Sequence, residues 1–382
     1  MRAAVLVDVA TLRPQVLPTP QPAPHEVLVR VTAVGLCGTD FHIFAGHANY
    51  HMDRRGEPVP LRQSPQILGH EIVGVVAEVG AAVTDLRPGD PVVLDQGRNC
   101  HSAQRAPACE YCASGDSHQC EHYAEHGITG LPGGLADGVV VPAVNAVRRT
   151  GPLAEAHAAL TEPLACVLHS SDRVAHQAAR YALRAPDPAR RVRSVLVCGA
   201  GPAGLLFVQY LRQVAGFDGT LLVAEPNPHK RALAAQFGGE PLDPTTVDLP
   251  TAVRERTQGR RVEYLIEATG AGAVFAAIPG LLRKQGTVLA YGHGHHGTDL
   301  SALNRVLFLE PTLVAAVGAS GGFDPDRRPA VYRRALQLLE QGTIQVAPLL
   351  SHHYRSLDAV VRAFTTDHRA ADYCKGVYLA PA

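Results

Sequence analysis

The sequence lacks an excess of charge of either sign. Lysine plus arginine and aspartate plus glutamate each number 35, so the formal net charge is zero. A chain without net positive charge has no overall field that attracts nucleic acid or an anionic membrane surface. We therefore expect a small-molecule partner, and neither a nucleic-acid nor a membrane partner.

The sequence also lacks long hydrophobic runs, low-complexity segments and internal repeats. Its longest apolar stretches, such as residues 194–197 and 221–224, are strand-sized and far below the roughly 20 residues of a membrane-spanning helix. The first residues turn polar and proline-rich after a short apolar run, whereas an export signal continues as an apolar segment. We expect a cytoplasmic protein.

A chain of 382 residues exceeds what one hydrophobic core usually organises, so we expect two domains. Up to about residue 91, short β-type runs broken by proline and glycine predict an all-β, barrel-like domain. From about 191 to 292, strand-sized and helical stretches alternate, which predicts βαβ units and a parallel sheet. Residues 153–184 predict a helical bridge. The expected fold class is α/β.

The domain boundaries follow from these changes of pattern. We place a first domain at residues 1–165, with a cysteine-rich lobe at about 97–122, and a second domain at 166–312. Residues 313–382 should return to the first domain, because the chain ends in the β-like stretch KGVYLA.

A glycine motif predicts a dinucleotide site. Directly after an apolar strand and before a helical run stand Gly199, Gly201, Pro202, Ala203 and Gly204. The G-x-G-x-x-G spacing permits a tight turn, close approach of a pyrophosphate, and a helix whose first amides face the phosphates. The alternative is that the glycines serve only a turn.

An acidic residue indicates which dinucleotide is bound. Glu225 follows the motif at about the 20-residue distance at which an acid bonds the adenosine ribose hydroxyls. A carboxylate there repels a 2′-phosphate, which favours NAD over NADP. Glu225 could instead cap the next helix, where Pro228 suits the first position. Arg231 could partly offset the carboxylate, although a surface helix residue is the simpler interpretation.

Two groups of potential metal ligands are present. Cys37, His70 and Glu71 offer the thiolate, imidazole and carboxylate that zinc accepts, although each alone is more often a core residue or a solvated charge. The second group has C-x2-C-x7-C spacing with one cysteine upstream, and consists of Cys100, Cys109, Cys112 and Cys120. Four thiolates are typical of a structural zinc. His101 and His118 are reserve ligands, and disulfides are the alternative in an oxidising compartment.

Several strings together resemble one family. GLCGTDFHIF, GHEIVGVVAEVG with DLRPGDPVV, and GAGPAG are similar to the zinc-containing medium-chain dehydrogenase/reductase family. CGTDFHI and AEPNPHKR are most similar to its threonine and polyol (sorbitol-type) branch. The resemblance covers essentially the whole chain. It implies a GroES-like β-barrel catalytic domain, a Rossmann doubly wound parallel-sheet domain, and a homodimer or homotetramer.

The resemblance also implies roles for residues. Cys37 and His70 would bind a catalytic zinc, with Glu71 as third ligand or close neighbour, and Glu162 in TEPLACVLH matches an acid at or near the metal. Cys166 competes with Glu162, although a buried core residue is its simpler interpretation. The family pattern has a cysteine where this chain has Ala106. Cys100 is therefore the expected fourth structural ligand, with an incomplete site as the alternative.

Zinc lowers the pKa of a bound hydroxyl, so the proton that this hydroxyl loses must be transferred to solvent. Thr39 and His42 match the relay positions of the family, and Thr269 in EATGAG resembles a loop that flanks nicotinamide. A turn-capping threonine and a surface histidine are the alternatives. Residues 46–66 should border the substrate cleft, where the possible hydroxyl binders are His47, Asn49, Tyr50 and Arg54; a surface loop or a subunit contact is the alternative.

We therefore expect zinc-dependent oxidation of a secondary alcohol by NAD. The expected substrates are a polyol, sugar, cyclitol or hydroxy amino acid. The alternatives are an NADPH-dependent carbonyl reductase of the same fold and a non-catalytic regulatory protein that binds zinc and a nucleotide.

Overall fold

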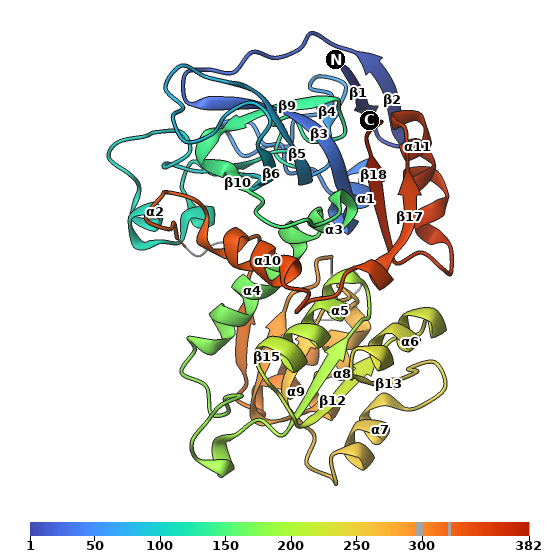
Figure 1. Ribbon diagram of the computed structural model, residues 1–382. Coiled ribbons are helices and arrows are strands. Elements are labelled where there is room, and N and C mark those ends of the chain that lie inside the picture. The colour runs from blue at the N-terminus through green and yellow to red at the C-terminus, as the bar shows by residue number, and fades with distance from the viewer. Residues whose placement is uncertain (295–300, 320–321, 382) are drawn as a thin grey trace. The chain divides into compact units, whose positions relative to one another are not determined.

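The computed structural model describes residues 1–294, 301–319 and 322–381 (Figure 1). The chain forms two compact units. Unit 1 consists of Met1–Ala165, Ala319–Gly342 and Val346–Ala382, and unit 2 of Cys166–Gly318 and Thr343–Gln345. Among the described residues, no helix combines the length and the apolar character needed to cross a bilayer.

Unit 1 is built mainly from strands. They are β1 (Arg2–Asp8), β2 (Thr11–Val16), β3 (Glu26–Leu36), β4 (Gln66–Ile67), β5 (Glu71–Val79), β6 (Pro91–Leu94), β7 (Gly97–Arg98), β8 (Ala124–Glu125), β9 (Gly138–Pro142), β10 (Ala146–Arg148), β17 (Leu350–Tyr354) and β18 (Lys375–Leu379). Its helices are α1 (Gly38–Phe44), α2 (Glu110–Ser114), α3 (Glu155–Ala158), α10 (Ala330–Glu340) and α11 (Leu357–Thr365).

The largest sheet of unit 1 combines strands from the N-terminal and C-terminal parts of the chain. Its order is β10-β6-β5-β3-β18-β17, and β9 also pairs with β3. The C-terminal strand β18 lies antiparallel to β3, with Val377 opposite Gly35, as the red and blue strands in Figure 1 show. Smaller sheets have the orders β2-β1-β4 and β7-β8. Valines and leucines of β3 and β5 lie in the same buried core, among them Val29, Val31 and Val76.

Unit 2 alternates strands and helices. Its strands are β11 (Ser194–Cys198), β12 (Thr220–Ala224), β13 (Glu240–Leu242), β14 (Val262–Glu267), β15 (Leu282–Ala290) and β16 (Thr312–Ala315). Its helices are α5 (Pro202–Gln209), which continues as a π-helical turn, α6 (Pro228–Gln236), α7 (Leu249–Arg256), α8 (Gly272–Leu281) and α9 (Ala302–Leu307).

All strand pairs of this sheet are parallel, in the order β13-β12-β11-β14-β15-β16. After β11 the chain adds β12 and then β13 on one side of it. It then crosses to the other side of β11 and adds β14, β15 and β16 in turn. The carboxyl ends of β11 and β14 therefore form the switch point at which open parallel sheets bind their ligands. Every residue of β11 is buried, as expected of a strand covered on both faces.

The predicted helical bridge is shorter than expected. The segment forms α3 and then α4 (Thr161–Ala175), and the helix ends well before residue 184. The residues that follow instead pack within unit 2: Tyr181 is buried, and its hydroxyl accepts a hydrogen bond of 3.0 Å from Arg283 Nε. This tertiary contact overrides the helical propensity of the alanine-rich sequence.

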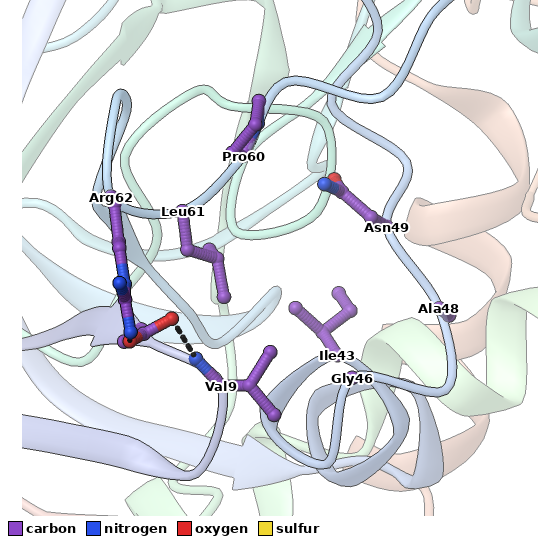
Figure 2. Close-up of a pocket in the computed structure, with 9 residues that line it drawn as sticks. Val9, Ile43, Gly46, Ala48, Asn49, Pro60, Leu61 and Arg62 are labelled. Carbon is purple, nitrogen blue, oxygen red and sulfur yellow. Dashed lines mark hydrogen bonds and ion pairs between the residues drawn. The ribbon is translucent and has the colours of Figure 1, made fainter.

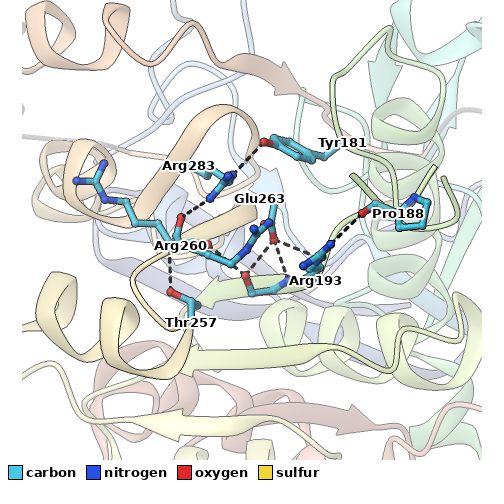
Figure 3. A network of polar contacts seen from close by, with 9 residues as sticks. Tyr181, Pro188, Arg193, Thr257, Arg260, Glu263 and Arg283 are labelled. Atoms are coloured by element: carbon cyan, nitrogen blue, oxygen red, sulfur yellow. Dashed lines mark hydrogen bonds and ion pairs between the residues drawn. The ribbon is translucent and has the colours of Figure 1, made fainter. Parts of the chain in front are cut away.

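A buried carboxylate fixes the start of the parallel sheet (Figure 3). Glu263 on β14 is completely buried, and its Oε2 accepts from the backbone nitrogens of Arg193 and Ser194 and from the Ser194 hydroxyl. Its Oε1 accepts from Arg260 at 2.9 Å. The central strands β11 and β14 are thus joined by a charged side chain as well as by backbone bonds.

Glu263→Gln should lower the free energy of unfolding by about 2 to 4 kcal/mol, because the charge-assisted bonds to Glu263 weaken and Arg260 loses its partner. Urea unfolding followed by circular dichroism measures the change. Glu255→Gln, on the exposed face of α7, is the matched control and should unfold like the wild type. Equal stability of the two variants would show that the network is not structurally important.

Candidate metal and dinucleotide sites

Cys37, His70 and Glu71 meet at one end of the large sheet of unit 1. Cys37 stands at the start of α1 directly after β3, and Glu71 opens β5, whose register places it opposite Gly35. One potential ligand atom from each of the three residues lies within 4.8 Å of the others. His70 and Glu71 are buried and Cys37 is half-buried. This donor set suits a single zinc ion with an open position.

Asp40, which the sequence analysis did not single out, holds two of these residues. Its completely buried carboxylate accepts a hydrogen bond of 2.8 Å from the Cys37 nitrogen, and its Oδ1 lies 3.4 Å from His70 Nδ1. Burial opposes protonation of His70, but the Asp40 carboxylate and Cys37 outweigh it and raise the pKa of His70 well above its usual value. Asp40 can therefore orient the imidazole of a metal-bound histidine.

Glu71 connects the group to the C-terminal strand. Its Oε1 forms a 2.5 Å ion pair with Nζ of Lys375, which is itself buried. Its Oε2 is buried and has no hydrogen-bond partner among the residues that the structure describes. An unpaired buried carboxylate oxygen is costly, and a cation beside it would remove that cost. The site therefore fits the metal that its donor set suggests.

Glu162 is not part of this close group among the described residues. Its Oε1 accepts a hydrogen bond of 2.9 Å from Gln96 Nε2, and Gln96 Oε1 accepts one from the Tyr332 hydroxyl. Burial lowers the pKa of Lys375, but Glu71, with smaller contributions that include Glu162, raises it above its usual value. Glu162 thus lies within electrostatic reach of the group.

Thr39 and His42 lie one helical turn apart on α1, which places them on the same face. The Thr39 hydroxyl is 3.7 Å from the Cys37 sulfur and is half-buried, whereas His42 is exposed. The pair therefore leads from the candidate metal ligands toward the surface of unit 1.

The four possible hydroxyl binders in the loop of residues 46–66 differ in their exposure and contacts. The Asn49 amide donates a hydrogen bond of 2.8 Å to the Val59 carbonyl. Asn49 also lines a surface pocket of about 390 Å³, together with Ile43 and Leu61 (Figure 2). His47 and Arg54 are exposed. Burial raises the pKa of the half-buried Tyr50, and the nearby charges of Glu125 and Cys37 add to the shift.

The four lobe cysteines form a second group. One sulfur from each of Cys100, Cys109, Cys112 and Cys120 lies within 4.8 Å of the others. None of the eight cysteines, all within the described part of the chain, is in a disulfide, and the Cys100 and Cys120 sulfurs are 3.6 Å apart. Backbone amides hold the pKa of Cys109 down, at about 6. Four thiols at this spacing can hold one zinc ion.

A turn formed by residues 99–102 positions Cys100, which lies upstream of the other three cysteines. Asn99 Oδ1 accepts from the nitrogens of His101 and Ser102, and Ser102 Oγ accepts from the Asn99 nitrogen at 2.7 Å. The Cys100 sulfur accepts a hydrogen bond of 3.4 Å from the Cys109 nitrogen. The turn thus places Cys100 beside the other three cysteines. It can serve there as the fourth thiol ligand, which Ala106 cannot provide.

The glycine motif of unit 2 has the required local geometry. Gly199 has a φ of +95°, which favours glycine. A methyl group at Gly204 would lie 1.9 Å from the Gly199 carbonyl oxygen, so the helix α5 can approach the turn only with glycine there. A methyl group at Gly201 would meet no described atom within 4 Å, so space remains beside the helix for a ligand. Pro202 is the first residue of α5 and Ala203 the second.

Glu225 faces the glycine turn and does not cap α6. Its Oε2 accepts a hydrogen bond of 2.7 Å from the Ala200 nitrogen, whereas the cap of α6 is Asn227. The Arg231 guanidinium is occupied by an ion pair of 2.9 Å with Asp243 and by two backbone carbonyls. A carboxylate at the turn and an occupied arginine both disfavour a 2′-phosphate.

Thr269 follows β14 at the switch point. Its methyl group lies against Gly199, since a methyl group on that glycine would come within 2.8 Å of it. Glu267 is buried and holds the loop through the nitrogens of Thr269 and Gly270. The loop and the glycine turn therefore form one packed surface at the carboxyl ends of β11 and β14.

Sequence reasoning missed the residues that support the ligands. Asp40 stands within the quoted CGTD string, and Lys375, one of three lysines in the chain, opens the quoted KGVYLA stretch. Both could have been noticed as charged residues next to apolar strands. Gln96 carries no such signal, because only the folded chain brings its side chain to Glu162.

Comparisons with known proteins agree with this geometry. Residues 23–150 match the family model described as alcohol dehydrogenase GroES-like domain, and residues 202–341 match the model described as zinc-binding dehydrogenase. These matches and the two sheets confirm the predicted GroES-like domain and Rossmann doubly wound domain.

Similar proteins match over most of their length. L-threonine 3-dehydrogenase of Pyrococcus abyssi is 28% identical over 90% of this chain and 88% of its own. The medium chain reductase/dehydrogenase ucsI of Acremonium sp. is 31% identical over 72% of this chain and 88% of its own. A zinc-binding dehydrogenase from Sinorhizobium meliloti 1021, solved bound to NADP, is 27% identical with a TM-score of 0.80, covering 99% and 98% of the two chains.

Asp40→Asn should weaken zinc binding at the Cys37 group by about 10- to 100-fold, because the orienting carboxylate of the histidine is lost. Competition with a chromogenic chelator measures the affinity, and the cysteine lobe serves as an internal reference. Asp8→Asn, in the surface ion pair with Arg62, is the control and should bind zinc like the wild type. Wild-type affinity in Asp40→Asn would rule out the orienting role.

Proposed function

This chain belongs to the zinc-binding medium-chain dehydrogenase/reductase family and is an oxidoreductase of alcohol groups, and we propose that it oxidises a secondary hydroxyl with NAD as acceptor. The substrate class is a small polyol, sugar, cyclitol or hydroxy amino acid. The observation that carries the proposal is the close group of Cys37, His70 and Glu71, with one buried oxygen of Glu71 left without a partner.

Within this proposal, Cys37 and His70 hold a catalytic zinc, and Glu71 is the third ligand or its close neighbour. When bound, zinc supplies Lewis acidity that stabilises negative charge on the substrate oxygen. Asp40 orients His70, and Lys375 fixes the Glu71 carboxylate. Glu162, held by Gln96, adds negative charge near the group. A buried, preorganised set of this kind requires little rearrangement during the reaction.

Thr39 and His42 are proposed to carry the proton away. The Thr39 hydroxyl stands beside the Cys37 sulfur and can accept a proton from the substrate hydroxyl while it donates its own. An imidazole can take up and release a proton near neutral pH, and the exposed His42, one turn along α1, is placed to exchange that proton with solvent.

In unit 2, Gly199, Gly201 and Gly204 are proposed to bind the pyrophosphate of NAD, with Pro202 and Ala203 at the start of α5. Glu225 is the ribose ligand and Thr269 flanks the nicotinamide. The S. meliloti relative was solved with NADP, so the preference for NAD rests on Glu225 and on the Asp243 pairing of Arg231.

In the cysteine lobe, Cys100, Cys109, Cys112 and Cys120 are proposed to hold a structural zinc. The lobe has a small core of its own, made of these sulfurs with Ala108 and Tyr123. A bound metal would supply the stability that so few apolar contacts cannot. The absence of disulfides among all eight cysteines supports a reducing compartment, and hence the cytoplasm.

We also propose a homodimer or homotetramer. The edge strand β16 of the parallel sheet exposes Leu313, and neighbouring Leu307, Phe308 and Val317 are also exposed. An uncovered apolar edge of this kind favours pairing with another copy.

The proposed reaction is tested by the formation of reduced nicotinamide from NAD with a panel of polyols, cyclitols, sugars and threonine. Cys37→Ser should lower kcat/KM by about 100-fold or more, because several kcal/mol of charge stabilisation are lost. Cys166→Ala, which removes the buried thiol four residues beyond Glu162, should retain activity. No turnover of any panel member by fully zinc-loaded wild type would refute the proposal and favour a non-catalytic role.

The cofactor preference gives an independent test. Glu225→Gln should narrow the ratio of kcat/KM for NAD over NADP by about tenfold, since the repulsion of the 2′-phosphate is removed. Glu255→Gln on the same unit is the control for a general change of charge. A wild-type enzyme that prefers NADP would instead support the carbonyl reductase alternative.

A further inference from the structure

One buried carboxylate holds the loop that follows β14 at the carboxyl edge of the parallel sheet. Glu267 is the last residue of β14 and is completely enclosed, with 1% of its surface exposed. Its Oε1 accepts hydrogen bonds of 2.7 Å from the Thr269 nitrogen and 3.0 Å from the Gly270 nitrogen, and a third from the Thr269 hydroxyl. The side chain thus folds back over the next residues and fixes their conformation.

The backbone of the same residue holds a second segment, at the end of β15. The Glu267 carbonyl oxygen accepts hydrogen bonds of 2.9 Å from the Tyr291 nitrogen and 2.8 Å from the Gly292 nitrogen. The Tyr291 ring lies edge-on to the ring of Phe207 on α5, with centroids 5.0 Å apart. Glu267 therefore joins both segments, and Tyr291 connects them to the helix that follows the glycine turn.

Two glycines allow these segments to interlock. A methyl group on Gly292 would lie 2.5 Å from Glu267 Oε2 and 2.2 Å from the Gly270 nitrogen. A methyl group on Gly270 would lie 2.2 Å from the His293 carbonyl oxygen, and the φ of Gly270 is +69°, which favours glycine. The two segments are thus in direct backbone contact, and a larger residue at either position would push them apart.

The interlocked segments lie on the second half of the sheet. In a doubly wound sheet, each half takes one of the two nucleotides of a dinucleotide that lies across the switch point. Glu225, which follows β12 in the first half, is the proposed ligand of the adenosine ribose. The half made of β14, β15 and β16 then remains for the nicotinamide nucleotide.

We propose that Glu267 is a positioning residue for the nicotinamide half of the cofactor. It acts through residues 269–271 and 291–293, which it holds in the arrangement that receives the nicotinamide nucleotide. The inference rests on the proposed function, since it requires a nicotinamide dinucleotide as the cofactor. It adds that two carboxylates serve the two halves separately, Glu225 by direct contact and Glu267 through the loops.

The physical effect is preorganisation. A loop that is already fixed in the unliganded protein lowers the ordering cost of binding. Without the charged acceptor, the nitrogens of Thr269 and Gly270 lose most of the bonding that fixes the loop, and it can adopt conformations that do not fit the ligand. The loss should be confined to ligands that extend over the second half of the sheet.

The test compares NAD with AMP, which contains only the adenosine half, by calorimetric titration into the zinc-loaded protein. Glu267→Gln should raise the dissociation constant of NAD by about 10- to 30-fold, because a neutral oxygen accepts from three donors less strongly than a carboxylate. The dissociation constant of AMP should stay at the wild-type value, which also reports that unit 2 is folded. Glu225→Gln should weaken AMP as well as NAD.

Gly292→Ala is a second variant that leaves the carboxylate intact. Its φ is outside the left-handed region, so alanine is compatible with the backbone, but its methyl group would press on Glu267 Oε2 and the Gly270 nitrogen. The segments must then move apart, and NAD should again be weakened while AMP is not. Glu310→Gln, an exposed acid of the same unit, is the matched control and should bind both ligands like wild type.

Two outcomes would overturn the inference. One is wild-type affinity for NAD in both Glu267→Gln and Gly292→Ala, and the other is an equal loss for NAD and AMP, which would assign Glu267 to general stability. Selective loss of NAD supports it. The proposed reaction fails separately: a wild type that binds NAD but forms reduced nicotinamide with no alcohol would refute that reaction and leave the positioning role in place.

Discussion

The metal group of unit 1 depends on the register between three neighbouring strands. β3 pairs with β5 so that Gly35 faces Glu71, and with β18 so that Gly35 also faces Val377. Cys37 just after β3, Glu71 at the start of β5 and Lys375 at the start of β18 therefore meet at one edge. A shift of one residue in either pairing would turn these side chains to the opposite face of the sheet.

That register also explains why a glycine occupies the centre of the arrangement. A methyl group on Gly35 would lie 1.9 Å from Glu71 Oε2, so the carboxylate fills the space of the missing side chain. Within the described part of the chain, the oxygen is thereby buried without a hydrogen bond, a costly state that a bound cation would relieve. Packing, charge and metal affinity are thus linked at one backbone position.

Much of the site could be predicted from sequence because the ligands of each group stand close to local signals. Cys37 follows a predicted strand, His70 and Glu71 precede one, and the glycine motif lies between a strand and a helix. The supporting residues could not be predicted in this way. Asp40, Gln96 and Lys375 act through partners far away in the chain, and the helical bridge ends early because Tyr181 packs against Arg283.

The sequence by itself determined the two kinds of sheet, the glycine turn and the side chains that could bind a metal, because these depend on residue type and short spacing. Only the tertiary structure decided that Cys100 joins the other three lobe cysteines and that, among the described residues, Glu162 lies outside the close group of Cys37, His70 and Glu71. Such distances depend on strand register and on folded turns, and no local pattern of residues records how distant segments are brought together.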